Sequence, residues 1–189
     1  MCELIDRLCA DHKNITIVLD FINDEIDKFG FTVAPSTELL SDSLRYLVEY
    51  ADNVHHPQEE IVFYQVSIHA SQLGDIVGTL TAEHDQIYQD GSELFDWING
   101  VENRQRDITA QQLRFGRDYV FLQTRHMQLE ESTVFPIARE LFSAQEWESI
   151  QSSYLMQSDP LFGDHVEPEY QTLRSQLDEF MPNNPSSAS

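Results

Sequence analysis

The sequence predicts an all-α protein, an antiparallel up-down four-helix bundle followed by one or two short C-terminal helices. Apolar side chains recur every three or four residues over four long segments, which is the spacing of one face of a helix. No segment shows the sustained apolar-polar alternation, bounded by hairpin dipeptides, that is typical of strands. Glycine and proline, at 7 each in 189 residues, are too few for a loop-dominated chain. With 41% hydrophobic residues, one core and one domain are expected.

The first two bundle helices each carry one inward face. The first is expected to end near Phe29–Gly30, where the periodicity stops at a glycine. Its inward positions are Ile5, Leu8, His12, Ile15, Leu19, Ile22 and Ile26. The second follows a loop around Pro35. Its inward positions are Leu44, Leu47, Val48, Ala51, His55, Glu59, Val62 and Val66.

The third and fourth helices repeat this arrangement. The third is expected from about Asp75 to Asn99–Gly100, with Leu80, His84, Ile87, Leu94 and Ile98 inward. The fourth opens at Thr109-x-x-Gln112, a capping-box sequence in which two side chains bond the free backbone amides of a helix start. Its inward positions are Phe115, Tyr119, Leu122, His126, Glu130, Val134 and Ile137.

Beyond the fourth helix the pattern becomes shorter and less regular. Ser143-x-x-Glu146 is a second capping box and predicts a helix to about Met156. A loop at 159–163, with the sequence Asp-Pro-Leu-Phe-Gly, precedes a last helix expected from Glu169 to Phe180.

The domain boundaries follow from this organisation. Residues 1–175 are expected to form the bundle domain, and residues 176–189 its C-terminal end and tail. The tail after Met181 is rich in Pro, Asn and Ser and is expected to be disordered.

Charge and composition exclude several classes of partner. The formal net charge is −22, from 33 acidic and 11 basic residues, so nucleic acid and anionic membrane are repelled. The first seven residues mix charges where a signal peptide needs an apolar stretch, and no run approaches the ~18 apolar residues of a membrane span. We therefore expect a cytoplasmic protein. Cys2 and Cys9 lie too far apart along one helix to form a disulfide, and both are expected to be thiols.

Two halves of the chain repeat one arrangement of metal-binding residue types. Each half has a helix with a single inward His, followed by a helix with His and, four positions later, Glu. The first half contributes His12, His55 and Glu59, and the second contributes His84, His126 and Glu130. Residues four apart lie on the same helix face, and antiparallel packing is expected to bring all six side chains to one level of the core.

Two inward carboxylates are costly unless something compensates them. Burying unpaired carboxylates is unfavourable, and facing carboxylates repel each other. A pair of metal ions removes both penalties, and imidazole nitrogen with carboxylate oxygen suits iron, manganese or zinc. The sequence therefore predicts a dinuclear site on these six residues.

The segment from His55 to Glu60 offers two registers, His55 with Glu59 or His56 with Glu60. The face that leads back from His55 is apolar, with Ala51, Val48, Leu47 and Leu44. The face that leads back from His56 is polar, with Asp52, Glu49 and Arg45. His55 and Glu59 are therefore expected to face inward, and His56 and Glu60 to lie outside the ligand set or in solvent. A kink expected at Pro57 leaves His56 open as an additional ligand.

These motifs resemble bacterial hemerythrin-like proteins of the HHE cation-binding family. The resemblance rests on the first-helix His, the sequence His55-His56-Pro57-x-Glu-Glu, the third-helix His, and His126-x-x-x-Glu-Glu followed by Phe135-Pro136. The loop at 159–163 also resembles a segment that follows the bundle in one branch of the family. The resemblance covers roughly residues 1 to 175.

The resemblance implies a non-haem di-iron site with two bridging Glu, on the six residues named above. Members with a fuller ligand set have an extra His, and Tyr88 stands one turn after His84 where such a residue is expected. An open iron position is therefore expected. The implied activities are binding or sensing of oxygen or nitric oxide, redox turnover of peroxide or nitric oxide, and iron buffering or donation. A sensor of this kind would act through a homodimer or an unknown protein partner.

Overall fold

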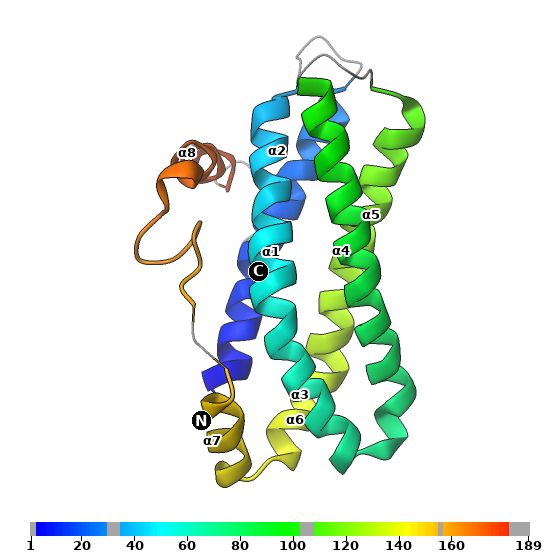
Figure 1. Ribbon diagram of the computed structural model, residues 1–189, viewed down its shortest axis with the longest axis vertical. Coiled ribbons are helices and arrows are strands. Elements are labelled where there is room, and N and C mark those ends of the chain that lie inside the picture. The colour runs from blue at the N-terminus through cyan, green and yellow to red at the C-terminus, as the bar shows by residue number, and fades with distance from the viewer. Residues whose placement is uncertain (1–2, 30–34, 103–107, 155–156, 182–189) are drawn as a thin grey trace.

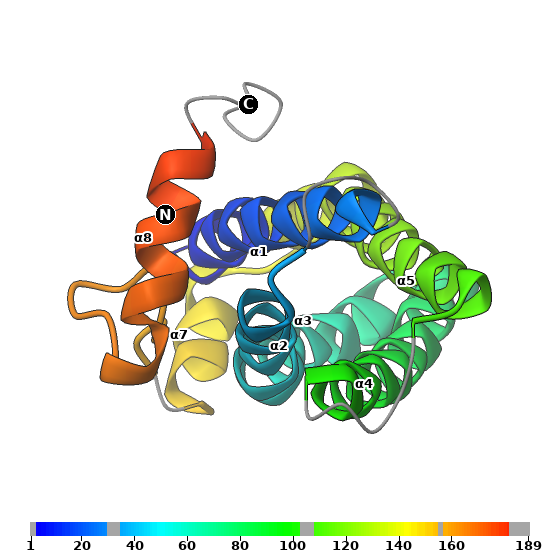
Figure 2. The ribbon, with the colours of Figure 1, turned by 90° about the horizontal axis from the view of Figure 1, so that it is seen from above.

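The protein forms a bundle of four antiparallel rods, described here from a computed structural model that covers residues 3–29, 35–102, 108–154 and 157–181 (Figures 1 and 2). Two rods are single helices, α1 (Glu3–Lys28) and α4 (Gly74–Glu102). The other two are composite: α2 (Thr37–Tyr46), a π-helical segment (Leu47–His55) and α3 (His56–His69), and then α5 (Ala110–Leu129), a π-helical segment (Glu130–Val134) and α6 (Phe135–Leu141). The rods run up, down, up and down, which confirms the predicted all-α bundle.

The helix starts follow the predicted capping chemistry. The Thr109 hydroxyl accepts a hydrogen bond from the Gln112 backbone amide, and the Gln112 side chain accepts one from the Thr109 amide. Ser143 and Glu146 make the same reciprocal pair ahead of α7 (Ala144–Ser152). The third rod continues to Glu102, past the predicted end at Gly100, because helical pairing persists through that glycine.

Both composite rods contain a π-helical segment just ahead of a proline. The His56 amide donates to the carbonyl of Ala51, and the Phe135 amide donates to that of Glu130, each five residues back. Pro57 and Pro136 lack the amide hydrogen of a normal helical turn, which leaves a carbonyl free for such a rearrangement. The irregularity expected beside Pro57 is therefore present as a wide turn, and an equivalent turn in the second half was not predicted.

The core is divided into two apolar clusters with a polar layer between them. On α1, Leu8 belongs to one cluster and Ile15 to the other, with His12 between them. On α4, His84 likewise separates Leu80 from Ile87. The polar layer therefore crosses the bundle near one level, as the spacing of the inward residues predicts.

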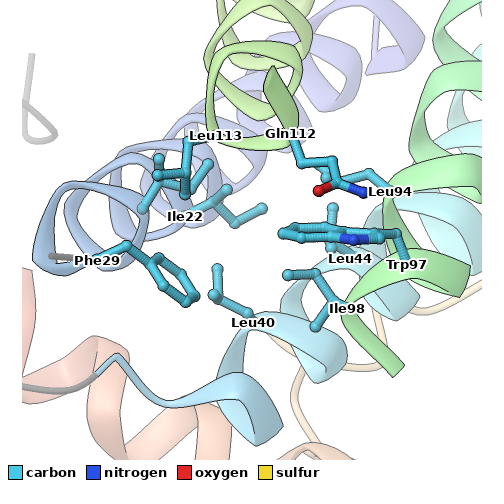
Figure 3. Close-up of a pocket in the computed structure, with 10 residues that line it drawn as sticks. Ile22, Phe29, Leu40, Leu44, Leu94, Trp97, Ile98, Gln112 and Leu113 are labelled. Atoms are coloured by element: carbon cyan, nitrogen blue, oxygen red, sulfur yellow. The ribbon is translucent and has the colours of Figure 1, made fainter. Parts of the chain in front are cut away.

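The end of the bundle away from α7 is closed by apolar packing (Figure 3). A narrow space there is lined by side chains that include Ile22, Leu40, Leu44, Leu94, Trp97 and Leu113. Gln112 supplies the amide at its edge. Carbon atoms dominate this lining, so the space is part of the core and offers no set of ligands for an ion.

The C-terminal segment packs along the side of the bundle. A short 3₁₀ turn (Pro168–Tyr170) leads into α8 (Gln171–Phe180), which packs on α1 and α2, so the predicted last helix is present. Met156, the predicted end of α7, and the predicted disordered tail after Met181 lie outside the described residues.

The loop at 159–163 is organised by its first and last residues. One Asp159 oxygen accepts from the backbone amides of Leu161 and Phe162, and the other accepts from Asn14 and from the Tyr46 hydroxyl. A Cβ atom at Gly163 would lie 2.4 Å from the Asp159 carbonyl oxygen, so the turn requires glycine there. These bonds tie the loop to both α1 and α2.

None of the described helices combines the length and apolar character needed to cross a bilayer. Cys9 is a half-buried thiol without a disulfide, as expected, and Cys2 lies outside the described residues.

Candidate metal centre

The six residues predicted as ligands meet in the polar layer, and each is between 0% and 8% exposed. They come from four rods: His12 from α1, His55 and Glu59 around the start of α3, His84 from α4, and His126 and Glu130 around the end of α5. The six side chains that the helical spacing predicts to face inward are therefore buried together in the bundle.

Glu59 lies between histidines of three rods. Its Oε1 is 2.9 Å from Nε2 of His12 and 3.0 Å from Nε2 of His55. Its Oε2 is 3.3 Å from Nε2 of His84. The two carboxylate oxygens thus face different histidines, as a carboxylate shared by two ions would.

Glu130 has the equivalent position in the second half. Its Oε1 is 3.2 Å from Nε2 of His126 and 3.8 Å from Nε2 of His84. Its Oε2 is 3.4 Å from Nε2 of His12. Both glutamates therefore reach across the bundle.

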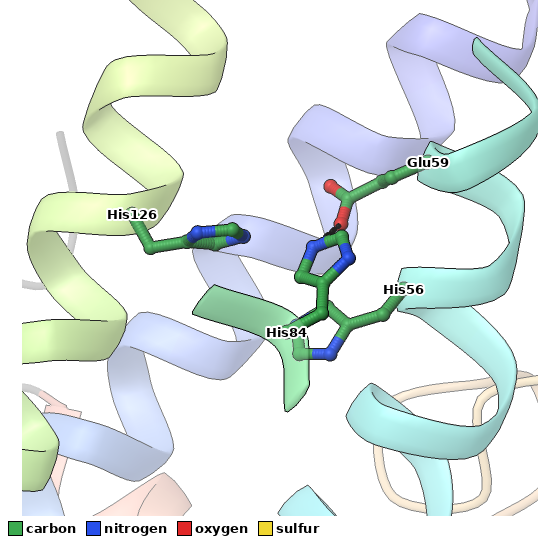
Figure 4. Close-up of side chains that lie close together, drawn as sticks. All are labelled: His56, Glu59, His84 and His126. Carbon is green, nitrogen blue, oxygen red and sulfur yellow. Dashed lines mark ion pairs between the residues drawn. The ribbon is translucent and has the colours of Figure 1, made fainter. Parts of the chain in front are cut away.

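The ligand atoms fall into two groups that share Glu59. In one group His12, His55 and Glu59 each offer an atom within 4.8 Å of the others. The second group combines His56, Glu59, His84 and His126 in the same way (Figure 4). Two adjacent groups with a common carboxylate match the donor arrangement of a dinuclear site.

The structure corrects the expected orientation of His56. Its side chain is buried, with 4% of the residue exposed, and its ring lies 4.2 Å from that of His84. The expectation of a solvent-facing His56 is wrong because the face count assumed regular α-helical turns. A π-helical turn holds more residues than an α-helical one, so it rotates the residues that follow. Both His55 and His56 consequently point into the bundle.

Each of the five histidines has a carboxylate beside its Nδ1 atom. The pairs are His12 with Glu131 at 2.9 Å, His55 with Asp11 at 3.3 Å, His56 with Asp52 at 3.2 Å, His84 with Glu60 at 2.7 Å, and His126 with Glu83 at 3.1 Å. A carboxylate on one ring nitrogen fixes the tautomer that leaves the other nitrogen free for a metal. Hydrogen bonds therefore orient four of the histidines for ligation, whereas Asp52 lies beside His56 without one. Glu60 bonds Nδ1 of His84 and is not among the grouped ligand atoms.

Sequence reasoning missed four of these carboxylates, Asp11, Asp52, Glu83 and Glu131. A signal for two of them is present in the chain, since an acidic residue directly precedes His12 and directly precedes His84. In each half, that residue serves the histidine of the following rod. The repeat of the two halves thus extends to the carboxylates that bond the Nδ1 atoms of the histidines.

Two histidines of the metal-free centre, His12 and His84, hold a proton strongly. Burial opposes a charged His12, but hydrogen bonds to Glu131 and Glu59 raise its pKa to about 10. Burial also opposes a charged His84, and the neighbouring carboxylates of Glu130, Glu59 and Glu60 raise its pKa to about 11. Although burial favours a neutral Glu59, the charge of His55 and hydrogen bonds from histidines hold its pKa well below the usual range.

His56 and Asp52 behave differently. Burial and the neighbouring charge of His84 lower the pKa of His56 well below its usual value. Burial raises the pKa of Asp52 to about 8. His56 is therefore a neutral imidazole, the form that binds metal.

Several buried nitrogen and oxygen atoms of the cluster have no hydrogen-bond partner among the described residues. They are Nε2 of His55, His84 and His126, Oε2 of Glu59, and both carboxylate oxygens of Glu130. Buried polar atoms are rarely left without hydrogen bonds, because each costs about 1–3 kcal/mol. Metal coordination satisfies all of them, so the residues present fit the ions that the sequence predicts.

Aromatic rings close two sides of the centre. Phe63 stacks on His84 at 5.5 Å and Phe135 stacks on His12 at 5.6 Å. Tyr88 is 48% exposed, whereas Tyr119 is buried in the core and its hydroxyl accepts from Gln123. The two phenylalanines therefore wall the site.

The fold and this cluster together define a helical-bundle protein with a histidine–glutamate metal site. The family model described as Hemerythrin HHE cation binding domain matches residues 3–138, well over half of the chain. The chain belongs to this family. No curated protein and no solved structure matches it. The family match ends within α6, so the domain boundary expected at residue 175 stays a prediction.

Proposed function

We propose that the protein holds two non-haem iron ions and uses them to bind a small diatomic ligand, oxygen or nitric oxide. The observation that supports two ions is the position of Glu59, which belongs to both groups of ligand atoms. Cation binding is the property named by the family description, whereas the number and identity of the ions are our proposal.

The donor set favours iron. Five imidazoles and two carboxylates supply nitrogen and oxygen without thiolate, which suits iron and also accepts zinc or manganese. Two carboxylates leave less negative charge than the four of ferritin-like oxidases, so a ligand-binding role is preferred over ferritin-type oxidation.

A second function is favoured by one feature of the surface. A cleft of about 470 Å³ reaches His56 and His84, with Tyr88 in its lining. A cleft of this size admits water and peroxide as readily as oxygen. Redox turnover of peroxide or nitric oxide is therefore the alternative, and a metal buffer or donor without turnover is the third.

One experiment separates these functions. Apo protein is loaded anaerobically with ferrous iron, the iron content is measured, and oxygen, nitric oxide or peroxide is added while visible spectra are recorded. The proposal expects about two irons per chain and a stable, stoichiometric adduct with oxygen or nitric oxide. Repeated consumption of peroxide or nitric oxide supports the enzyme, and iron that leaves without an adduct supports the buffer. Absence of iron after loading refutes all three.

A further inference from the structure

The cleft between α3 and α4 gives the metal centre an opening to solvent. It has a volume of about 470 Å³, and its lining includes Asp52, His56, Glu60, His84, Asp85 and Tyr88. His56 and His84 belong to the ligand cluster, whereas Asp85 and Tyr88 are exposed. The cleft therefore leads from the surface to one of the two groups of ligand atoms.

Other sides of the centre are covered. His55 and His126 are 1% and 0% exposed, and the apolar clusters pack above and below the polar layer. Phe135 stacks on His12. An ion that approaches from these sides must displace packed side chains.

The outer part of the cleft is acidic. Glu60 and Asp85 contribute carboxylates there, no Lys or Arg is among the lining residues, and the positive charge of His84 faces Glu60. An exposed carboxylate at the mouth of a cleft concentrates cations and speeds their association. This arrangement attracts a cation and repels an anion.

Asp52 adds an observation that is independent of surface charge. Its side chain is 1% exposed, and neither oxygen makes a hydrogen bond, although Oδ1 lies 3.2 Å from Nδ1 of His56. A buried carboxyl group in this state has oxygens available to an ion. It lines the inner part of the path, next to the ligands.

We propose that this cleft is the port through which divalent cations load the metal centre, with Asp85 at the surface and Asp52 inside guiding the ion toward His56 and His84. The proposal rests on the proposed function, because it assigns a route to the same ions. A divalent cation fits better than a small anion, because the carboxylates of Asp85 and Glu60 attract the first and repel the second.

The test uses full-length apo protein and Co²⁺, whose visible absorption changes when it enters a nitrogen–oxygen site. Uptake is followed by stopped flow at several Co²⁺ concentrations for the wild type, Asp85→Asn and Asp85→Lys. Asp118→Asn and Asp118→Lys are the matched controls. Asp118 is also exposed, but it lies on α5 about 12 Å along the helix from His126.

If the cleft is the port, Co²⁺ should associate fastest with the wild type, more slowly with Asp85→Asn and slowest with Asp85→Lys. The slowest variant is expected to be about three- to tenfold slower than the wild type at about 10 mM ionic strength. The difference should vanish near 0.5 M salt, because screening shortens the range of the charge to a few ångströms, on the order of 4 Å. The Asp118 variants should match the wild type, and all five proteins should reach the same final absorbance.

Two outcomes overturn the port while leaving the metal site intact. One is equal rates for the Asp85 and Asp118 variants. The other is a loading rate that does not depend on Co²⁺ concentration, which means that opening of the bundle limits uptake. If Co²⁺ does not bind the wild type at all, the proposed function fails, and the port fails with it.

Discussion

The imidazole of His56 stacks on that of His84, with ring centroids 4.2 Å apart and 14° between the ring planes. Two stacked imidazolium ions would repel each other, and the lowered pKa of His56 keeps that ring neutral. His56 also lies 5.8 Å from His126, measured between ring centroids. These contacts place a fifth histidine beside the six predicted ligands, in the group that faces the cleft.

Replacing His56 should weaken one ion more than the other. His56→Ala removes a donor from the group with His84 and His126 and leaves the His12–His55 group complete. We expect the affinity for the ion held by His84 and His126 to fall at least 10–100-fold, which is the loss typical of residues that only orient a ligand. Equilibrium dialysis against Co²⁺ should then show one tight and one weak ion per chain. His55→Ala is the counterpart for the other group, and unchanged affinity at both positions in His56→Ala refutes ligation by His56.

The outer carboxylates, which lie beside the Nδ1 atoms of the histidines, should contribute to metal affinity without touching the ions. Glu60→Gln and Glu131→Gln keep the side-chain size but weaken the hydrogen bonds to Nδ1 of His84 and His12. A loss of 10–100-fold in metal affinity is expected for each. Glu140→Gln, an exposed change on α6, is the control for altered net charge. If all three variants bind metal equally, these carboxylates do not orient the ligands.

The inward face of each helix could be predicted because burial imposes a helical period on apolar residues. His12 and His84 lie on unbroken α-helices, where the count of three and four residues holds. The count failed at His56, where a π-helical turn changes the number of residues per turn. Pro57 signalled an irregularity there but not the direction in which the chain would rotate.

The outer carboxylates could not be predicted from the helical period, for a different reason. Asp11 accepts from His55, which belongs to another rod, and Glu83 likewise serves His126. Such pairs depend on the rotation of one helix against its neighbour, which side-chain packing determines. A single-helix period carries no information about that rotation.

Gly91 and Gly78 should respond oppositely to alanine. A Cβ atom at Gly91 would lie 3.0 Å from the hydroxyl of Tyr119, whose ring is buried and packed, whereas Gly78 has open space. Gly78→Ala should stabilise the protein by about 0.5–1 kcal/mol through helix propensity. Gly91→Ala should destabilise it by about 1 kcal/mol, because overpacking of about 1–3 kcal/mol exceeds that gain. Denaturant unfolding measures both, and stabilisation by Gly91→Ala would show that the Tyr119 ring yields easily.

The last prediction concerns how metal and pH act together on stability. In the metal-free protein, interactions with carboxylates raise the pKa of His12 to about 10 and that of His84 to about 11, from an ordinary value of 6.5. A group with a raised folded pKa stabilises the fold fully below its unfolded pKa. That stabilisation is lost as the pH rises toward the folded pKa. The stability of the apo protein should therefore fall between about pH 6.5 and 8.5.

The metal-loaded protein should not show this loss of stability. Ligation needs neutral imidazole, so an entering ion must displace the protons on His12 and His84, and its affinity rises with pH. At a thousandfold excess over Kd, binding adds roughly 4 kcal/mol, or about 10 °C in Tm for a chain of this length. The Tm difference between loaded and apo protein should thus widen from pH 6.5 to 8.5. Thermal unfolding with and without Co²⁺ measures this difference, and calorimetry in two buffers of different ionisation enthalpy counts the protons released. A gap that stays constant or narrows with pH, together with no proton release, would mean that these histidines do not exchange protons for metal.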